Sequence, residues 1–185
     1  MFELSKIGLI LRKISMTIQN LKKTAYHHYG EHPFSIIKFL YYSGIRINTF
    51  YIYENDLTGK ISQLGLDPEF TVLKPNLEEL ERIREGKDLP REFFYDKIYN
   101  LRTYYLVFEG SELAKIYWVV FKEDYNRFLI LNEKAAELNY NTTLPKFRGR
   151  QLMAKMMAHI SMDLKHMGYQ KAMGVIHEFN PPALR

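Results

Sequence analysis

The feature of this sequence that most limits its fold is a strand, a basic turn and a helix that follow one another between Glu137 and Met167. From Glu137 to Leu144 two sets of side chains alternate, and the threonine and tyrosine among them suit a pleated surface. Pro145 ends this strand because it has no N–H to donate. Beyond the turn, apolar residues recur at helical spacing, at Leu152, Met156, Ile160, Leu164 and Met167. The pattern predicts a mixed α/β (α+β) domain.

The turn between the strand and the helix carries Lys146, Arg148 and Arg150 around Gly149. The first backbone N–H groups of a helix have no partner inside it and carry the positive end of the helix dipole. Cations beside such an end favour an anion, most simply a phosphate or pyrophosphate. The alternative is a solvated basic loop.

These residues resemble the pyrophosphate turn of the GNAT superfamily of acyl-CoA-dependent N-acetyltransferases. That turn reads roughly (V)-x-P-x-x-(R/Q)-x-x-G-x-(G/A) and grips the pyrophosphate of coenzyme A through main-chain N–H groups. The residues that fit it here are Thr143, Pro145, Arg148, Gly149 and Arg150. Gln151 and Met153 stand where the motif has two small residues, and glycine lets a ligand approach the backbone closely. The departure predicts weaker or shifted binding of coenzyme A.

The order of the predicted elements extends this resemblance. Strands are expected at residues 70–73, 102–108, 113–121, 137–144 and 171–177. Asn76 is expected to begin the first helix in a capping box with Glu79, and Pro90 to open a second. The order β-α-α-β-β-β-α-β is that of the GNAT family, whose sheet is mixed, mostly antiparallel and flanked by helices. Residues 68–185 are therefore expected to form a GNAT-like domain, and residues 1–67 an N-terminal extension of helix and strand.

The last residues continue the resemblance, since Asn180 and Ala183 match the N-x-x-A that follows the fifth family strand. In the family this strand splays from its neighbour and opens a slot for the pantetheine arm. A tyrosine that often acts as general acid, and two closing strands, would lie beyond Arg185. Either the chain is truncated, or its sheet is completed by the N-terminal extension or by a second subunit, as in a homodimer. An uncovered strand at residues 171–177 would be an aggregation liability.

Two residues are candidates for catalysis. Acetyl transfer from a thioester to an amine needs a base for the amine and a proton for the leaving thiolate. Glu137 stands eleven residues before Arg148, the position of the glutamate base in part of the family, and partial burial would raise its pKa. A solvated glutamate at a sheet edge is the alternative. His177, at the end of the last strand, is the second candidate, with a structural histidine as its alternative.

The resemblance also implies the ligands. Acetyl-CoA would be the co-substrate, and the acceptor a small-molecule or peptide amine. Thr143 and Leu144 would offer main-chain groups to the pantetheine, and Asn180 would bind coenzyme A near the thioester. The residues expected around the pyrophosphate are Lys146, Phe147, Arg148, Gly149, Arg150, Gln151, Leu152 and Met153. No metal is expected, because nothing completes a ligand set around His27, His28 and His32.

Composition sets outer limits on function. The net charge of +5 is mild; it suits an anionic ligand such as coenzyme A and is weak evidence for nucleic acid, which we do not expect as a partner. Cysteine is absent, which excludes a cysteine nucleophile and fits a cytoplasmic protein. No apolar run approaches the roughly 20 residues of a membrane span.

Two rival functions stay open beside the enzyme. Gln151, Met153 and the absent tyrosine favour a non-catalytic acyl-CoA-binding regulatory domain. Residues 1–29 have the pattern of a basic amphipathic helix. Such a helix packs on its own domain, or it lies weakly on a membrane surface or a partner.

Overall fold

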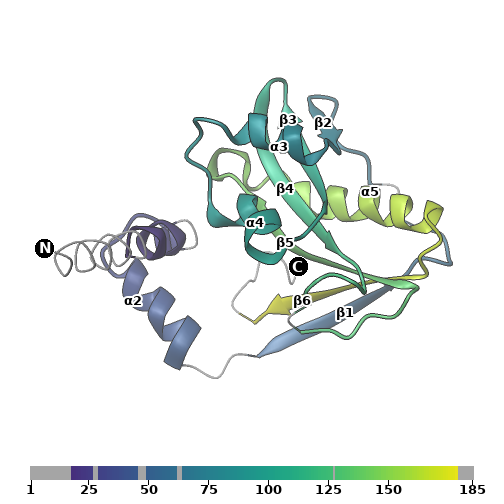
Figure 1. Ribbon diagram of the computed structural model, residues 1–185, viewed down its shortest axis with the longest axis horizontal. Helices are drawn as coiled ribbons and strands as arrows, with labels where there is room; N and C mark the ends of the chain where they lie inside the picture. The colour runs from purple at the N-terminus through teal and green to yellow at the C-terminus, as the bar shows by residue number, and fades with distance from the viewer. Residues whose placement is uncertain (1–17, 27–28, 46–48, 62–63, 127, 179–185) are drawn as a thin grey trace, which may run out of the picture. The chain divides into compact units, whose positions relative to one another are not determined.

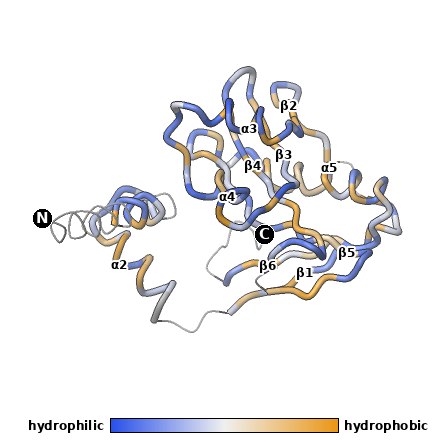
Figure 2. The backbone as a smooth tube through the Cα atoms, in the orientation of Figure 1, coloured by the Kyte–Doolittle hydropathy of each residue, from blue (hydrophilic) through white to orange (hydrophobic). Residues whose placement is uncertain are grey.

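The structure, a computed structural model, describes residues 18–26, 29–45, 49–61, 64–126 and 128–178 (Figure 1). It divides the chain into two compact units, Met1–Asn48 and Thr49–Arg185. In the first unit, residues 18–26 are helical, and α2 (Ser35–Leu40) leads into a π-helical turn, η1 (Tyr41–Ile45). Hydrophobic residues run along α2 (Figure 2). Of the helix predicted over residues 1–29, residues 1–17, 27 and 28 lie outside the described residues, as do His27 and His28 themselves.

The second unit is built on one six-stranded sheet with the order β1-β6-β5-β4-β3-β2. Its strands are β1 (Phe50–Asp56), β2 (Phe70–Leu73), β3 (Thr103–Glu109), β4 (Glu112–Val120), β5 (Ala135–Thr143) and β6 (Lys171–His177). All neighbours are antiparallel except β5 and β6, which are parallel. The helical elements are α3 (Leu77–Arg84), η2 (Arg91–Phe94), α4 (Tyr95–Tyr99), η3 (Pro145–Phe147) and α5 (Leu152–His166). The predicted mixed, mostly antiparallel α+β sheet is confirmed.

The sheet buries a hydrophobic cluster on each face, because successive strand residues point to opposite sides. On β4, Tyr117 and Val119 pack with Met156 and Ile160 of α5. Trp118, the residue between them, packs in the second cluster, which α3 and η2 cover; its members include Leu80, Phe93, Leu106, Ile116 and Val120. The sheet is therefore sandwiched between α5 on one face and the α3–α4 segment on the other.

Local sequence signals were reliable in this unit. Asn76 caps α3 in the expected capping box: its side chain accepts from the amide of Glu79 at 2.9 Å, and the Glu79 carboxylate accepts from the Asn76 amide at 2.9 Å. The strand at residues 70–73 has the predicted bounds. The predicted hairpin joins β3 to β4 with Gly110 at φ 58°, a left-handed conformation that favours glycine.

The strand β1 covers the edge of β6, pairing with it antiparallel from Phe50 opposite His177 to Asp56 opposite Lys171 (Figure 1). Of the alternatives raised for closing the sheet, the structure shows the N-terminal extension supplying this strand, so no second subunit is needed to cover β6. The sequence analysis placed the division of the chain between residues 67 and 68, whereas the compact unit begins at Thr49. The difference arises because β1 is joined to the sheet by pairing with residues far along the chain.

Candidate acyl-CoA and catalytic site

The turn predicted to hold a pyrophosphate, residues 144–151, joins β5 to α5. The η3 turn follows β5 directly, and Gly149 has φ 80°. Gln151 precedes the first residue of α5 with φ 56° and ψ 20° and makes no side-chain capping bond. Because the first bond within α5 runs from the Lys155 amide to the Gln151 carbonyl at 3.2 Å, the preceding amides of α5 have no acceptor inside the helix. Gln151 therefore holds, at a cost, a left-handed conformation that a small residue would adopt more easily.

The cations of the turn are engaged by neighbours. Lys146 pairs with Glu112. Arg150 pairs with Glu109 at 2.5 Å and with Glu69 at 2.7 Å. Arg148 donates from Nε to the carbonyl oxygen of Thr143 at 3.2 Å and is exposed. The basic charge at the turn is thus largely offset by carboxylates in ion pairs that are exposed or partly exposed, and such pairs are weak in water.

Three residues predicted to contact coenzyme A are tied into the protein. Phe147 and Leu152 pack in the cluster beneath α5, with 1% and 2% of their surface exposed. The amide of Leu144 donates to the carbonyl of Ala114, and the Leu144 carbonyl accepts from the amide of Phe147, each at 2.9 Å. A ligand at the turn would therefore meet main-chain groups of α5 rather than these side chains. Asn180 lies outside the described residues.

Glu137 is fully buried near the middle of the sheet, between Val120 of β4 and Met173 of β6. Its carboxylate accepts hydrogen bonds from the side-chain amides of Asn139, at 2.8 Å, and Asn126. Burial raises the pKa of Glu137, and the two amide donors oppose that rise. The solvated glutamate considered from the sequence differs from this environment.

Beside Glu137, β5 and β6 part. Their parallel pairing ends at Glu137 opposite Met173. Two residues further along, β5 carries a bulge: Trp118 pairs with Asn139 and Tyr117 with Asn141, which leaves Tyr140 as the extra residue, at φ 52°. We call the region where β5 and β6 diverge beyond this last pair the fork. It lies between the buried Glu137 and the turn.

Tyr53 of β1 reaches the start of the fork, which the sequence did not reveal. Its hydroxyl donates to the carbonyl of Leu138 at 3.1 Å, and burial raises the pKa of Tyr53 to about 12. Its ring lies over Gly174 of β6, where a Cβ would be 2.2 Å from the ring carbon Cζ. The buried hydroxyl of Tyr117 lies next to that of Tyr53, without a hydrogen bond of good geometry. Gly174, a glycine inside a predicted strand, is the sequence signal from which this close approach could have been predicted.

Lys115 is the second buried group that the sequence analysis missed. It lies on β4, opposite Thr143, and is fully buried. Its Nζ donates to Oδ1 of Asn141 at 2.6 Å and to Oγ1 of Thr143 at 3.1 Å. Burial lowers the pKa of Lys115 to about 7. A lysine inside the apolar run of residues 113–120 was the available signal.

His177 is not brought to Glu137. It stands four residues beyond Met173 on β6, roughly 13 Å along an extended strand. Its ring packs edge-on against Phe50 of β1, with 5.0 Å between ring centroids. The structure therefore places the two predicted catalytic residues apart.

On the opposite face of the sheet from α5, tyrosines gather near Glu137. Tyr140, the bulge residue, packs edge-on against Tyr95 and at a tilt on Tyr99, with centroids 5.4 Å and 6.1 Å apart. Tyr125 stacks on Tyr99 at 5.6 Å and immediately precedes Asn126, which binds Glu137. This group of tyrosines is therefore connected to the buried carboxylate through Asn126.

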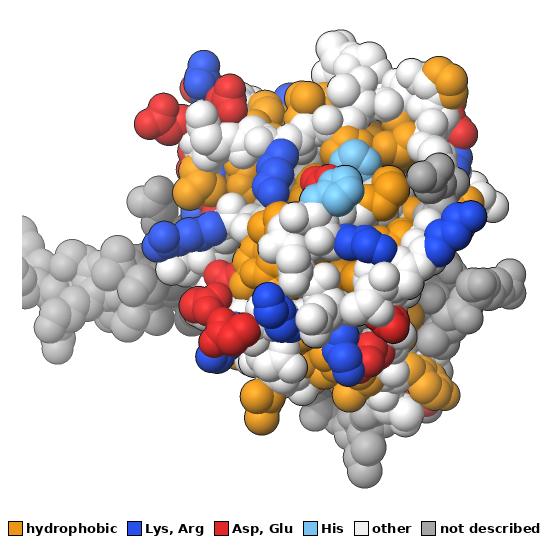
Figure 3. All heavy atoms as spheres, turned by 90° about the vertical axis from the view of Figure 1, so that its right-hand side faces the viewer, with side chains coloured by type: hydrophobic (Ala, Val, Ile, Leu, Met, Phe, Trp, Pro, Cys, Tyr) orange, Lys and Arg blue, Asp and Glu red, His pale blue; other side chains and the backbone are white. Residues whose placement is uncertain are grey.

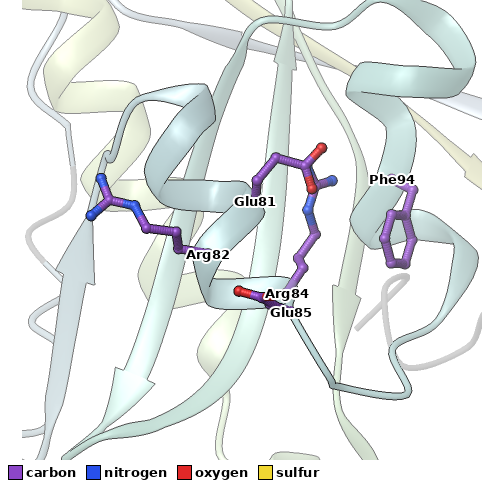
Figure 4. A pocket seen from close by; sticks show the side chains of 5 residues that line it. All are labelled: Glu81, Arg82, Arg84, Glu85 and Phe94. Carbon is purple, nitrogen blue, oxygen red and sulfur yellow. The ribbon is translucent and has the colours of Figure 1, made fainter.

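A cavity of about 400 Å³ lies elsewhere, at α3, and contains none of the predicted site residues (Figure 4). It is lined by Glu81, Arg82, Arg84, Glu85 and Phe94. Arg84, one of these lining residues, makes a bidentate bond to Asp96, at 2.7 Å and 2.9 Å. The Arg84 guanidinium therefore joins α3 to α4.

The molecular surface and the helices can be compared with what nucleic acid, metal or membrane binding would require. On the face shown in Figure 3, lysine and arginine side chains are scattered among acidic and apolar ones rather than gathered into a stripe. Within the described ranges, no three His, Asp or Glu side chains are grouped closely enough to hold a metal ion. No helix in the part of the chain that the structure describes has the length and apolar character to cross a bilayer.

Comparison with known proteins gives the fold a name. No protein-family model matches the sequence, and neither does any curated protein. Among solved structures, the chain is similar to a GCN5-related glucosamine N-acetyltransferase region of a fungal multi-domain GH3 β-N-acetylglucosaminidase, with a TM-score of 0.54 and 13% identity over 77% of this chain. It is also similar to a GCN5-related N-acetyltransferase from Sphaerobacter thermophilus (TM-score 0.50, 11% identity over 77% of this chain). The chain spans 20% and 47% of the lengths of these two proteins. The fold of this protein is GNAT-like, as its sequence motifs predicted.

Proposed function

We propose that this protein is an acyl-CoA-dependent N-acetyltransferase that transfers an acetyl group from acetyl-CoA to an amine. One observation carries the proposal: a buried carboxylate, Glu137, lies where β5 and β6 part, on the strand that leads into the turn at the start of α5. The GNAT-like fold supports it, because both similar structures are described as N-acetyltransferases. A cytoplasmic location belongs to the same proposal and fits a chain without cysteine.

The residues at the turn fit an acyl-CoA, which would supply the reactive thioester carbonyl. The amides of Leu152 and Met153 are available at the positive end of α5. Arg148 is exposed beside them, and the ion pairs of Lys146 and Arg150 are exposed enough to rearrange around an anion. Thr143 and Asn141 border the fork, where the acyl-bearing arm would lie.

Glu137 acts as the base in the proposed reaction. It accepts a proton from the acceptor amine, directly or through a water molecule, and the raised pKa of the carboxyl makes it a stronger base than a solvated glutamate. The amine nitrogen then forms a bond to the carbonyl carbon and the carbon–sulfur bond breaks. The leaving thiolate takes up a proton from solvent, and the Glu137 carboxyl returns its proton to solvent. Asn126 and Asn139 hold the carboxylate in one orientation throughout.

A non-catalytic acyl-CoA-binding domain is the second candidate, and a specific observation favours it. Gln151 holds a left-handed conformation at the start of α5, and glutamates offset two of the turn's cations. Both features weaken the grip on a pyrophosphate. Turnover with any amine would exclude this candidate.

The test is a substitution at Glu137. Calorimetric titration with acetyl-CoA comes first, followed by a thiol-release assay against a panel of small amines, amino sugars and peptides. We expect Glu137→Gln to lower kcat by about 10²–10⁴-fold, the usual contribution of a positioned base, with acetyl-CoA affinity unchanged. Glu133→Gln is the matched control, because Glu133 is exposed just before β5 and forms an exposed ion pair with Lys122.

Thermal unfolding of both variants shows whether the fold is retained. Release of thiol at the native rate by a folded Glu137→Gln protein would remove Glu137 from the mechanism. An unaltered chain that binds acetyl-CoA but acetylates nothing in the panel would favour the regulatory domain.

A further inference from the structure

We propose that Lys115 is a ligand-responsive residue of this site: it takes up a proton when a pyrophosphate-bearing ligand binds at the turn, and its new charge then helps to hold that anion. The inference rests on the proposed acyl-CoA site. It concerns a residue that neither the GNAT-like turn motif nor the proposed acetyl transfer requires.

The position of Lys115 ties it to the turn. Its side chain crosses from β4 to the part of β5 beyond the bulge, and its Nζ bonds to Asn141 and Thr143. Both partners are only partly buried, although Lys115 itself is fully buried. The carbonyl of Thr143 in turn accepts the Nε bond of Arg148. A ligand lying along this part of β5 would therefore contact the groups that surround the ammonium.

The partners of Lys115 leave its charge uncompensated. An ammonium has three N–H donors, and the two bonds from Nζ end on an amide oxygen and a hydroxyl oxygen, both neutral. Among the described residues no carboxylate forms an ion pair with Lys115. A buried cation without a counter-charge loses its hydration, which is why the pKa of Lys115 falls to about 7. Near neutral pH the side chain is thus close to half protonated.

The groups that face Lys115 from the packed elements would not supply the missing negative charge. On β4 the neighbour is the ring of Tyr117, whose centroid is 5.3 Å from Nζ and whose own pKa is raised by burial. The hydrophobic cluster that contains Tyr117 includes Val107 of β3 and Leu152 and Met156 of α5, all apolar. From the turn, the cationic Arg148 donates to the carbonyl of Thr143, whose hydroxyl accepts from Lys115. An anion bound at the turn would be the first negative charge in this environment.

The sign of the effect follows from these charges. A pyrophosphate close to Lys115 favours the charged form and raises its pKa. At pH 7 binding then shifts a half-protonated lysine toward the protonated form, an uptake of up to about half a proton per ligand. The uptake is expected to be larger at pH 8 and smaller at pH 6, where the lysine is already mostly charged. Affinity accordingly weakens as pH rises above 7.

The experiment is calorimetric titration of the full chain with dephospho-CoA, in buffers of equal pH but different ionisation enthalpy. This ligand keeps the pyrophosphate and lacks the 3′-phosphate, which itself titrates near neutral pH. The dependence of the observed heat on buffer enthalpy gives the number of protons taken up. We expect Lys115→Met to abolish the uptake and to weaken binding at pH 6.5 by about tenfold, whereas the exposed control Lys134→Met changes neither.

A second measurement keeps the inference testable if Lys115→Met does not fold. NMR titration of side-chain-labelled lysines in the unaltered protein should show one lysine with a pKa near 7, which rises when dephospho-CoA is added. Binding without proton uptake, uptake that persists in Lys115→Met, or no lysine titrating near neutral pH would each overturn the role of Lys115 and leave the acetyltransferase proposal standing. Absence of any binding of acetyl-CoA or dephospho-CoA would overturn both.

Discussion

The turn and the fork are neighbours on β5 but differ in how their charged side chains are partnered and how deeply they are buried. At the turn, the exposed Lys146 and the half-buried Arg150 are paired with glutamates. Glu137 at the start of the fork and Lys115 on the adjoining strand β4 are fully buried and have only neutral hydrogen-bond partners. Exposed pairs contribute little free energy and adjust to a ligand, whereas buried unpaired groups have shifted pKa values. The comparison suggests that the turn would hold the ligand and the fork would respond to it chemically.

The packing of the fork should make it far less tolerant of change than the turn. Gly174→Ala is expected to lower the free energy of unfolding by about 1–3 kcal/mol, since an added Cβ would lie 2.2 Å from the ring of Tyr53, which must then move. Denaturant unfolding followed by circular dichroism measures the change.

Gly59→Ala is the matched control for this prediction, because a Cβ there meets no heavy atom within 4 Å and the backbone has no positive φ. The double variant Gly174→Ala with Tyr53→Ala should cost less than the sum of its parts, as expected for two groups in contact. A Gly174→Ala protein as stable as Gly59→Ala would mean that Tyr53 does not pack over β6.

The same contrast explains what could be read from the sequence. The capping box of Asn76 and Glu79, the hairpin at Gly110 and the strand–turn–helix around Pro145 depend on residues close together in the chain, so local rules found them. The pairing of β1 with β6 joins residues more than a hundred positions apart, and no local pattern encodes it. The compact unit that contains β1 therefore begins at Thr49, before the boundary expected from local signals.

The candidate site likewise contains residues that a local sequence pattern reveals and residues that it does not. The turn could be proposed as a site from the sequence because its motif is contiguous, and Glu137 because it stands a fixed number of residues before Arg148. Tyr53 and Lys115 were missed because burial beside β5 depends on which strands lie next to it. Gly174 within a strand and a lysine within an apolar run were the local traces of these contacts.

At the turn, a substitution should improve stability rather than reduce it. Gln151 has φ 56°, a conformation that costs a residue with a Cβ roughly 1 kcal/mol and glycine very little. Gln151→Gly is therefore expected to raise the free energy of unfolding by up to about 1 kcal/mol and to tighten binding of acetyl-CoA, because the backbone becomes more approachable. Thermal unfolding and calorimetric titration measure the two effects.

Gly149→Ala is the matched comparison for Gln151→Gly, because Gly149 lies in the same turn at φ 80°. Adding a Cβ there should lower the free energy of unfolding by about as much as removing the Gln151 side chain raises it. If Gln151→Gly gains neither stability nor affinity, the left-handed conformation does not limit the turn.

The smallest effect is expected from the ion pair between Lys146 and Glu112. Both side chains are more than half exposed, at 64% and 54%, so water screens the attraction and the pair contributes at most about 0.5 kcal/mol. Glu112→Gln should leave unfolding unchanged within that limit, yet it removes a negative charge next to the proposed pyrophosphate site and should strengthen acetyl-CoA binding at low salt. Glu133→Gln, at an exposed pair away from the turn, should do neither. A gain in affinity that survives in 0.5 M salt would show that Glu112 acts by more than its screened charge, and a loss of more than about 1 kcal/mol of stability would show that the turn is held by its ion pairs after all.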